Sequence, residues 1–243
     1  MTESYQQEKI DLAAALRLAA RFDLHEGIAN HFSFALDDDG ERFLLNPHGI
    51  HWSLLRASDI LVANRHGDVL DGDGEAERTA ICIHGQVHHL HPRARCVLHT
   101  HMPYATALTA IEDGRLEPVV QSSLMFYGDV AYDDEYGGLA FSDEEGARIA
   151  GALGDKRILF MANHGVMVVG KTIAQAFNDL YYLERACQVQ VLVMSTGRPL
   201  KLVGDNRAAG TFDPDGHEDY IYGEDHFAAL KRILDAEDPS YAA

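Results

Sequence analysis

Two histidines one residue apart, His99 and His101, are the residues of this sequence with the clearest capacity for chemistry. They follow the apolar residues Val97 and Leu98, a pattern that predicts a buried strand. Side chains at positions i and i+2 of a strand point to the same side, with Cα atoms about 6.5–7 Å apart. Two imidazoles in this arrangement can bind one metal ion at about 2.0–2.1 Å from each nitrogen. The alternative interpretation is a pair of histidines on a polar strand face.

A third histidine in suitable surroundings is His164, within Asn163-His164-Gly165 between two very apolar runs. The pattern predicts a strand, a corner and a second strand, with Gly165 permitting a positive φ at the corner. Taken alone, His164 would be interpreted as a turn residue bonded to the backbone. Together with the His-x-His pair it predicts a three-histidine site with open coordination positions, which catalysis requires and a structural metal site does not.

The elements that must position these histidines follow from apolar periodicity and from turn residues. The expected helices cover residues 7–22, 75–91, 103–111, 142–151 and 172–196. The expected strands cover residues 31–36, 42–50, 59–64, 67–72, 94–101 and both sides of 163–165. Because several strands follow one another directly, the pattern predicts an α/β fold whose sheet is not purely parallel.

One domain is expected for residues 1–203, because no linker interrupts them. From Gly204 onward the composition becomes polar. Residues 204–243 are therefore expected to form a C-terminal tail with a short helix near 228–236. We expect this tail to pack on the same domain or on a neighbouring subunit.

The composition restricts partners and location. A net charge of −18 disfavours nucleic acid and anionic membrane surfaces as partners, because both would be repelled. Three cysteines without a CxxC spacing predict no disulfide framework. The N-terminal segment lacks the pattern of a signal peptide, and no apolar stretch approaches the roughly 20 residues that span a bilayer. We therefore expect a soluble cytoplasmic protein that acts on a small molecule.

Four segments together resemble the class II aldolase/adducin family over roughly residues 8–200: CVLHTHMPYATALT, FYGDVAY, ILFMANHGVMVVGKTIAQAF and LERACQVQ. The resemblance implies a three-layer α/β/α domain around a mixed, largely antiparallel sheet, and a homotetramer with active sites at subunit interfaces. It also implies a divalent metal ion at His99, His101 and His164, zinc in the first instance with manganese or iron as alternatives. In enzymes of the family this ion stabilises the enolate formed when a C–C bond beside a carbonyl breaks.

The sequence departs from the family's sugar-phosphate aldolases in two places. Their Ser-Ser-Glu segment carries the acid/base glutamate; here the matching residues are Arg78-Thr79-Ala80, so that glutamate is absent. The phosphate loop of those aldolases is also altered in this sequence, although the asparagine of the loop is matched. These changes favour a substrate without a phosphate group. The implied substrate-binding positions are Asn30, His48, Gly49, Arg78 and Thr79.

Two residues beside the missing glutamate are predicted to replace it in proton transfer. Glu77, Ala80 and His84 share one helix face by their i, i+3, i+7 spacing. We expect His84, with an ordinary pKa of about 6.5, within about 4–7 Å of the open side of the metal. The alternatives are a solvated first-turn residue for Glu77 and a packing role for His84. Three further histidines are expected at the surface near the helix end: His88, His89 and His91.

The leading hypothesis is a divalent-metal-dependent carbon–carbon lyase, an aldolase or decarboxylase acting on a small hydroxy-carbonyl or carboxylated substrate. An Fe(II) oxygenase on the same three histidines is a second enzymatic hypothesis. A third is a non-catalytic, adducin-like oligomeric interaction domain, which the absent glutamate favours and the three retained histidines oppose. The apolar and aromatic segment 122–132 is the candidate surface for oligomerisation.

Overall fold

An eight-stranded sheet lies at the centre of the structure, a computed structural model that describes residues 5–212 and 217–243. Its order is β4-β3-β2-β1-β5-β8-β7-β6, and each neighbouring pair is antiparallel except β6 and β7. The strands are β1 His31–Ala35, β2 Arg42–Leu45, β3 Leu61–Asn64, β4 Val69–Asp71, β5 Cys96–Thr100, β6 Val130–Asp133, β7 Ile158–Met161 and β8 Gly165–Gly170. The sheet is therefore mixed and largely antiparallel, as predicted.

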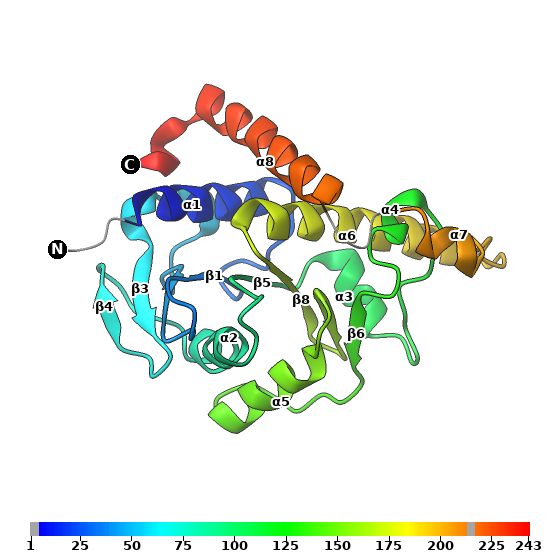
Figure 1. The fold of residues 1–243 in the computed structure, drawn as a ribbon, viewed down its shortest axis with the longest axis horizontal. Helices are drawn as coiled ribbons and strands as arrows, with labels where there is room; N and C mark the ends of the chain where they lie inside the picture. Colours follow the sequence, from blue (N-terminus) through cyan, green and yellow to red (C-terminus); the bar gives the residue numbers. More distant parts are fainter. Residues whose placement is uncertain (1–4, 213–216) are drawn as a thin grey trace.

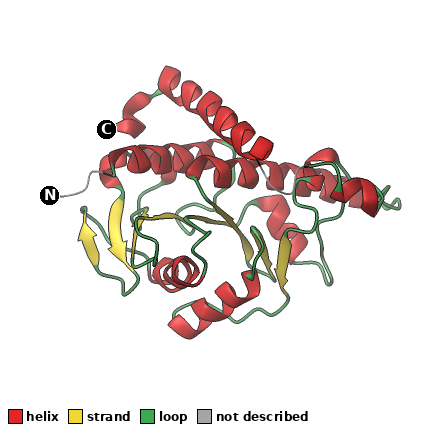
Figure 2. Cartoon of the chain, in the orientation of Figure 1, coloured by secondary structure: helices red, strands yellow, loops and turns green. Residues whose placement is uncertain are grey.

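Helices cover both faces of this sheet (Figure 1). The long helices α1 and α6 lie on one face, and α8 lies outside them in contact with both. Helices α2 and α5 pack against each other on the opposite face, as the cartoon in Figure 2 also shows. The helices are α1 Gln6–Arg21, α2 Arg78–Leu90, α3 Pro103–Thr109, α4 Gln121–Leu124, α5 Asp143–Leu153, α6 Ile173–Met194, α7 Asp205–Ala209 and α8 His217–Glu237. The predicted three-layer α/β/α arrangement is confirmed.

Strand β5 shows why the sheet is covered on both sides. Leu98 belongs to the core beneath α1 and α6, together with Phe177. Val97 points the other way and packs in a second core with Ile83 of α2. Because successive side chains face opposite layers and both layers are apolar, this strand shows no polar alternation until His99. The first metal-site candidate thus stands at the end of a rigid, fully buried strand.

The C-terminal segment contains a longer helix than the sequence pattern indicated. A helix was expected near residues 228–236, whereas α8 extends over His217–Glu237. Phe227 and Leu230 are buried in the same core as α1 and α6, so this segment packs on the same domain as the sheet. Strand β6 was also not predicted, since it lies in a segment for which only a contact surface was expected.

Within the described residues, no helix is both long enough and apolar enough to cross a membrane. The three cysteines, Cys82, Cys96 and Cys187, are free and buried. They come from a helix of one layer, the central sheet and a helix of the other layer. The fold therefore rests on packing around the sheet and not on disulfide bonds.

Candidate metal centre

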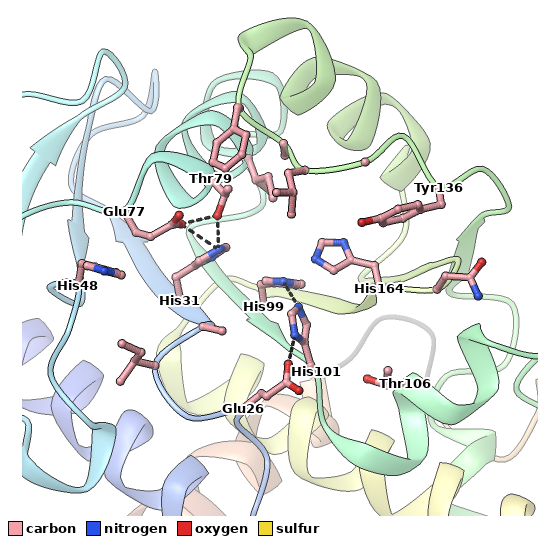
Figure 3. A pocket seen from close by; sticks show the side chains of 18 residues that line it. Glu26, His31, His48, Glu77, Thr79, His99, His101, Thr106, Tyr136 and His164 are labelled. Atoms are coloured by element: carbon pink, nitrogen blue, oxygen red, sulfur yellow. Dashed lines mark hydrogen bonds and ion pairs between the residues drawn. The ribbon is translucent and has the colours of Figure 1, made fainter.

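Three histidines converge where β5 ends and where β7 turns into β8. His99 is in β5, His101 follows that strand, and His164 lies in the β7–β8 turn. Antiparallel pairing of β5 with β8 brings these two places together. The three ring centroids lie 4.8–4.9 Å apart, and one potential ligand atom from each ring lies within 4.8 Å of the others. Figure 3 shows the three rings facing one another.

The Nδ1 atoms of two of these histidines are already engaged. His99 Nδ1 lies 3.0 Å from the Val166 carbonyl oxygen, and His101 Nδ1 lies 2.6 Å from Glu26 Oε2. Since a carbonyl and a carboxylate accept hydrogen bonds, each Nδ1 carries the proton and each Nε2 presents a lone pair. Partners of this kind fix the tautomer of metal-binding histidines.

The separation of the two free nitrogens suits a shared ion. His99 Nε2 and His101 Nε2 lie 3.1 Å apart. Two ligands at about 2.0–2.1 Å from one ion, with an angle of about 90–109° between them, lie about 2.9–3.4 Å apart. Without a cation, two lone pairs would repel each other at this distance. The residues present therefore fit a divalent metal ion.

Two backbone features place His164 against this pair. Asn163 has φ 54°, a left-handed conformation that asparagine tolerates better than most residues, and its N–H donates to the Thr109 carbonyl at 3.0 Å. The prediction of a positive φ at Gly165 is wrong, since the left-handed residue is its neighbour. Gly165 is needed because a Cβ there would lie 2.5 Å from the Thr100 oxygen and 2.7 Å from His101 Cδ2. Its lack of a side chain lets β8 approach the metal-site candidate.

Burial favours the neutral form of two site histidines, His99 and His164, by lowering the pKa of each. Desolvation lowers the pKa of His99 well below its ordinary value, and the neighbouring imidazoles lower it further. Desolvation also lowers the pKa of His164 to about 4. Metal binding requires the unprotonated imidazole, so at neutral pH protons do not compete for His99 and His164.

The three histidines open onto a pocket of about 600 Å³. Glu77, Thr79 and His31 line one side of it, and Tyr136 lies on the side of His164 (Figure 3). This volume is within the range of small-molecule sites, which is about 300–1,000 Å³. The pocket can hold a substrate of modest size in contact with a bound ion.

Glu77 is a carboxylate held in ionised form inside this pocket. It caps the N-terminus of α2, accepting hydrogen bonds from the Ala80 N–H at 2.9 Å and from the Thr79 hydroxyl. Its Oε2 lies 3.8 Å from His31 Nε2. Burial alone would raise the pKa of Glu77, but these hydrogen bonds and the nearby imidazole bring it below the ordinary value. Glu77 can therefore accept a proton from a bound molecule.

His84 lies behind His31 and does not line the pocket. Its ring is completely buried, with Nε2 2.7 Å from His31 Nδ1 and Nδ1 2.5 Å from Ser33 Oγ. The sequence placed His84 at the open side of the metal, but His31 stands between the two. The expectation that His88 lies at the surface is wrong: it is buried and bonded to Ser33 Oγ at 2.7 Å. The shared reason is that α2 packs this face against the sheet.

The hydrogen bonds that join His31, His84, Ser33 and His88 all donate in one direction, from His31 towards the Ala94 carbonyl. The Ala94 carbonyl can only accept, so His88 Nδ1 donates to it at 2.8 Å. Burial lowers the pKa of His88 to about 4, and the neutral ring then accepts from Ser33 through Nε2. Ser33 in turn accepts from His84, and His84 accepts from His31 Nδ1. His31 is thereby left with an unprotonated Nε2 facing the pocket.

The remaining predicted substrate-binding residues occupy different places. His48 and Thr79 line the pocket. Gly49 has φ 83°, the left-handed conformation that the corner after His48 requires. Arg78 is not among the residues that line the pocket, because its guanidinium donates to the Phe141 carbonyl at 3.5 Å.

Asn30 supports the ligands from below the pocket. It is buried, and its side-chain oxygen accepts from the Glu26 N–H at 2.7 Å and from the His101 N–H at 3.3 Å. Asn30 therefore joins the backbone of a ligand to the backbone of that ligand's carboxylate partner. This contact positions the metal-site candidate.

The pocket residues that were not predicted from the sequence include Glu26, His31 and Tyr136. A signal existed for His31, because it stands opposite His99 in the pairing of β1 with β5. That pairing could not be known before the strand order was known. Glu26 and Tyr136 lie in loops whose sequence carries no comparable pattern.

The chain belongs to the class II aldolase and adducin N-terminal domain family, whose model matches residues 10–191. A Caulobacter vibrioides protein provisionally assigned to the class 2 aldolases is 33% identical over 244 residues, covering 100% of this chain and 94% of that protein. Alpha-adducin of Mus musculus is also 33% identical over 92% of this chain, which spans only 32% of the adducin. The resemblance in the sequence is thus confirmed.

Solved structures agree with this assignment. An aldolase II superfamily protein from Pseudomonas syringae superposes with a TM-score of 0.90 at 29% identity, covering 100% of this chain and 98% of that one. An L-fuculose 1-phosphate aldolase from Glaciozyma antarctica superposes with a TM-score of 0.83 at 28% identity, covering 96% and 91%. The fold is that of the class II aldolases.

Proposed function

We propose that this protein is a divalent-metal-dependent carbon–carbon lyase whose ion is held by His99, His101 and His164. The observation that supports this most directly is the pair of Nε2 lone pairs 3.1 Å apart, with His164 beside them. A divalent ion held there, zinc in the first instance, supplies Lewis acidity that polarises a carbonyl and offsets the negative charge developing when the adjacent C–C bond breaks. Three protein ligands leave coordination positions for the substrate.

Glu77 is the proton acceptor in this proposal. It is ionised, lines the pocket and lies 3.8 Å from the unprotonated Nε2 of His31. A substrate hydroxyl that donates its hydrogen bond to Glu77 would lose that same proton to the carboxylate. We assign to His84 the positioning of His31, in place of the direct proton transfer that the helix spacing suggested.

We further propose a homotetramer with the pocket near a subunit boundary, and a cytoplasmic location. The family supports the assembly, as does the exposure of Tyr127 within the aromatic segment 122–132. The free state of the three cysteines supports the location. Light scattering at micromolar concentration tests the assembly, and a monomer would contradict it.

The test combines metal analysis with an activity screen. The purified protein is expected to contain close to one divalent ion per chain. It should release an aldehyde or CO₂ from members of a panel of hydroxy-ketones and keto acids, lose this activity on chelation and regain it with the ion. Glu77→Gln should lower turnover by about 10²-fold or more at unchanged metal content, whereas the exposed Glu112→Gln should not. Stoichiometric metal with no cleavage of any panel member would contradict the proposal.

A second candidate is a non-catalytic, adducin-like interaction domain. The observation in its favour is that alpha-adducin matches this chain at the same 33% identity as the bacterial relative. A scaffold does not need an ion with open coordination positions. Metal at well below one ion per chain, together with an unchanged oligomeric state after chelation, would favour this candidate over the lyase.

A further inference from the structure

The charged side chains of the pocket lining are acidic, and the only basic side chains among its described residues are histidines. Its described lining includes two carboxylates, Glu26 and Glu77, and no lysine or arginine. Arg78 is adjacent in sequence, but its guanidinium is directed to the Phe141 carbonyl. Phosphate groups are usually recognised by arginine, lysine or helix N-termini, and carboxylates repel them. In this pocket a phosphate would meet the ionised Glu77, which already occupies the N-terminus of α2.

One segment of the pocket lining is apolar. The segment 136–141, between β6 and α5, contributes Tyr136, Leu139 and Phe141, with exposed fractions of 54%, 68% and 54%. Figure 3 shows Tyr136 across the pocket from Glu77. When an apolar group of a ligand covers such exposed apolar side chains, the free energy of the complex is lowered. The pocket therefore combines polar groups, the histidines and Glu77, with an apolar wall formed by residues 136–141.

This apolar wall is fixed to the domain at its base. Ala140 is buried in the core between the sheet and α5. The carbonyl of Phe141 accepts from Arg78, so the C-terminal end of the wall is attached to the start of α2. Its N-terminal part lies against α5, since a Cβ on Gly137 would meet the Glu145 carboxylate at 2.2 Å. A wall held at both ends can select ligands by shape and polarity.

We propose that the substrate joins a hydroxy-carbonyl head to an uncharged, apolar tail, aliphatic or aromatic, that packs against Leu139 and Phe141. The head lies at the three histidines and Glu77, so this inference rests on the proposed function. Exclusion of phosphate follows from the missing basic residue, and preference for the apolar tail follows from the exposed wall.

The test uses three hydroxamates as probes, because a hydroxamate chelates a divalent ion and so imitates the head. They are acetohydroxamate, benzohydroxamate and phosphonoacetohydroxamate, titrated into the metal-loaded protein by calorimetry. Benzohydroxamate is expected to have a Kd about tenfold or more below that of acetohydroxamate, because its ring covers the wall. Phosphonoacetohydroxamate is expected to bind no more tightly than acetohydroxamate.

Two variants locate the preference. Leu139→Ala and Phe141→Ala should each reduce the advantage of benzohydroxamate over acetohydroxamate by about three- to tenfold, with the Kd of acetohydroxamate unchanged. Both side chains are more than half exposed, so neither change threatens the fold. Leu70→Ala is the matched control: it is 52% exposed on β4 and does not line the pocket.

Two kinds of outcome are distinguishable. If acetohydroxamate binds but phosphonoacetohydroxamate binds more tightly, or if neither variant changes the benzohydroxamate advantage, the inference is overturned while the metal site stands. If no probe binds to protein that holds its ion, the open-sided metal site of the proposed function fails, and the inference fails with it.

Discussion

Two groups that contain histidines lie next to each other in this molecule, and they differ in whether the second ring nitrogen has a hydrogen-bond partner. The groups are the metal-site histidines, His99, His101 and His164, and the buried histidine chain, His31, Ser33, His84 and His88. In the first group, protein acceptors take Nδ1 of His99 and His101, and Nε2 stays free. In the second, both nitrogens of His84 and of His88 are bonded within the protein. The same residue type thus serves binding in one place and packing in the other.

Burial alone does not distinguish a metal-binding histidine from a structural histidine. His99 and His84 are both almost completely buried, and burial lowers the pKa of both. They differ in what faces the second nitrogen: another lone pair for His99, a hydrogen-bond partner for His84. A buried lone pair without a hydrogen-bond donor can be satisfied by a cation, whereas a lone pair that accepts a hydrogen bond stabilises the fold. Four predictions test this distinction, in order of decreasing effect.

Removal of a metal-site histidine should abolish metal binding with little effect on folding. His99→Ala is expected to lower bound metal from about one ion per chain to near zero, because two ligands remain and affinity depends on the full set. Mass spectrometry of the metal content after dialysis measures this. His66→Ala, an exposed histidine on the surface, should retain the ion. Full metal content in His99→Ala would remove the distinction between the two groups.

Removal of a histidine from the buried chain should have the reverse effect. His84→Ala leaves His31 Nδ1 and Ser33 without their partner and opens a cavity, so the free energy of unfolding should fall by about 2–4 kcal/mol. Metal content should stay near one ion per chain. Urea denaturation of the metal-free protein gives the stability, again with His66→Ala as reference. Loss of metal without loss of stability would assign His84 to the metal site.

Removing the charge of Glu26, which accepts a hydrogen bond from His101, should weaken metal binding less than removing a metal-site histidine does. Glu26→Gln weakens the hydrogen bond to His101 Nδ1 and lowers the basicity of its Nε2, so metal affinity should fall by about 10- to 100-fold. Competition with a chromophoric chelator measures this affinity. Glu77→Gln is the matched control, because this carboxylate of the same pocket contacts Thr79, Ala80 and His31. Equal losses in both variants would indicate a general charge effect instead of a specific contact.

The buried histidine chain should make stability depend on pH. Burial lowers the pKa of His31 and His88 to about 4, below the value of about 6.5 in an unfolded chain. The unfolded state therefore binds protons that the folded state does not, and stability should fall as the pH drops from 6.5 towards 4. The slope is at most about 1.4 kcal/mol per pH unit for each such histidine.

Urea denaturation of metal-free protein at several pH values between 7.5 and 5 measures this slope. His88→Leu should flatten it by the share of one proton, since the variant lacks one neutral buried imidazole. A slope unchanged in His88→Leu would show that other groups control the acid sensitivity. An increase in stability on acidification would contradict the neutral state of the buried chain.

The residue spacing on α2 predicted which side chains share a helix face but not what that face contacts. It correctly placed Ala80 and His84 on one helix face, and both are completely buried. Because α2 lies across the sheet, the face with His84 meets β1, whereas Glu77, Thr79 and Ile83 reach the pocket. A period of 3.6 residues identifies neighbours along a helix but carries no information on the layer beneath it.

The loops around the pocket were hardest to predict. Asn163 adopts the positive φ that was expected at Gly165, because asparagine also tolerates that conformation. The role of Gly165 depends on the distance to Thr100 and His101, which no local pattern expresses. The apolar wall at residues 136–141 had no signal, since it has neither helical nor strand periodicity.

The sequence by itself determined the α/β class, the approximate bounds of its main elements and the candidate ligand set, because strand alternation, helix periodicity and the two histidine motifs are local. The three-layer arrangement was implied by the family resemblance. The tertiary structure decided which histidines remain free. His31 and His84 are 53 residues apart in the chain, and His99 and Val166 are 67 apart. Contacts over such separations depend on strand order and helix placement, so the partner of each second nitrogen is set only when the layers have packed.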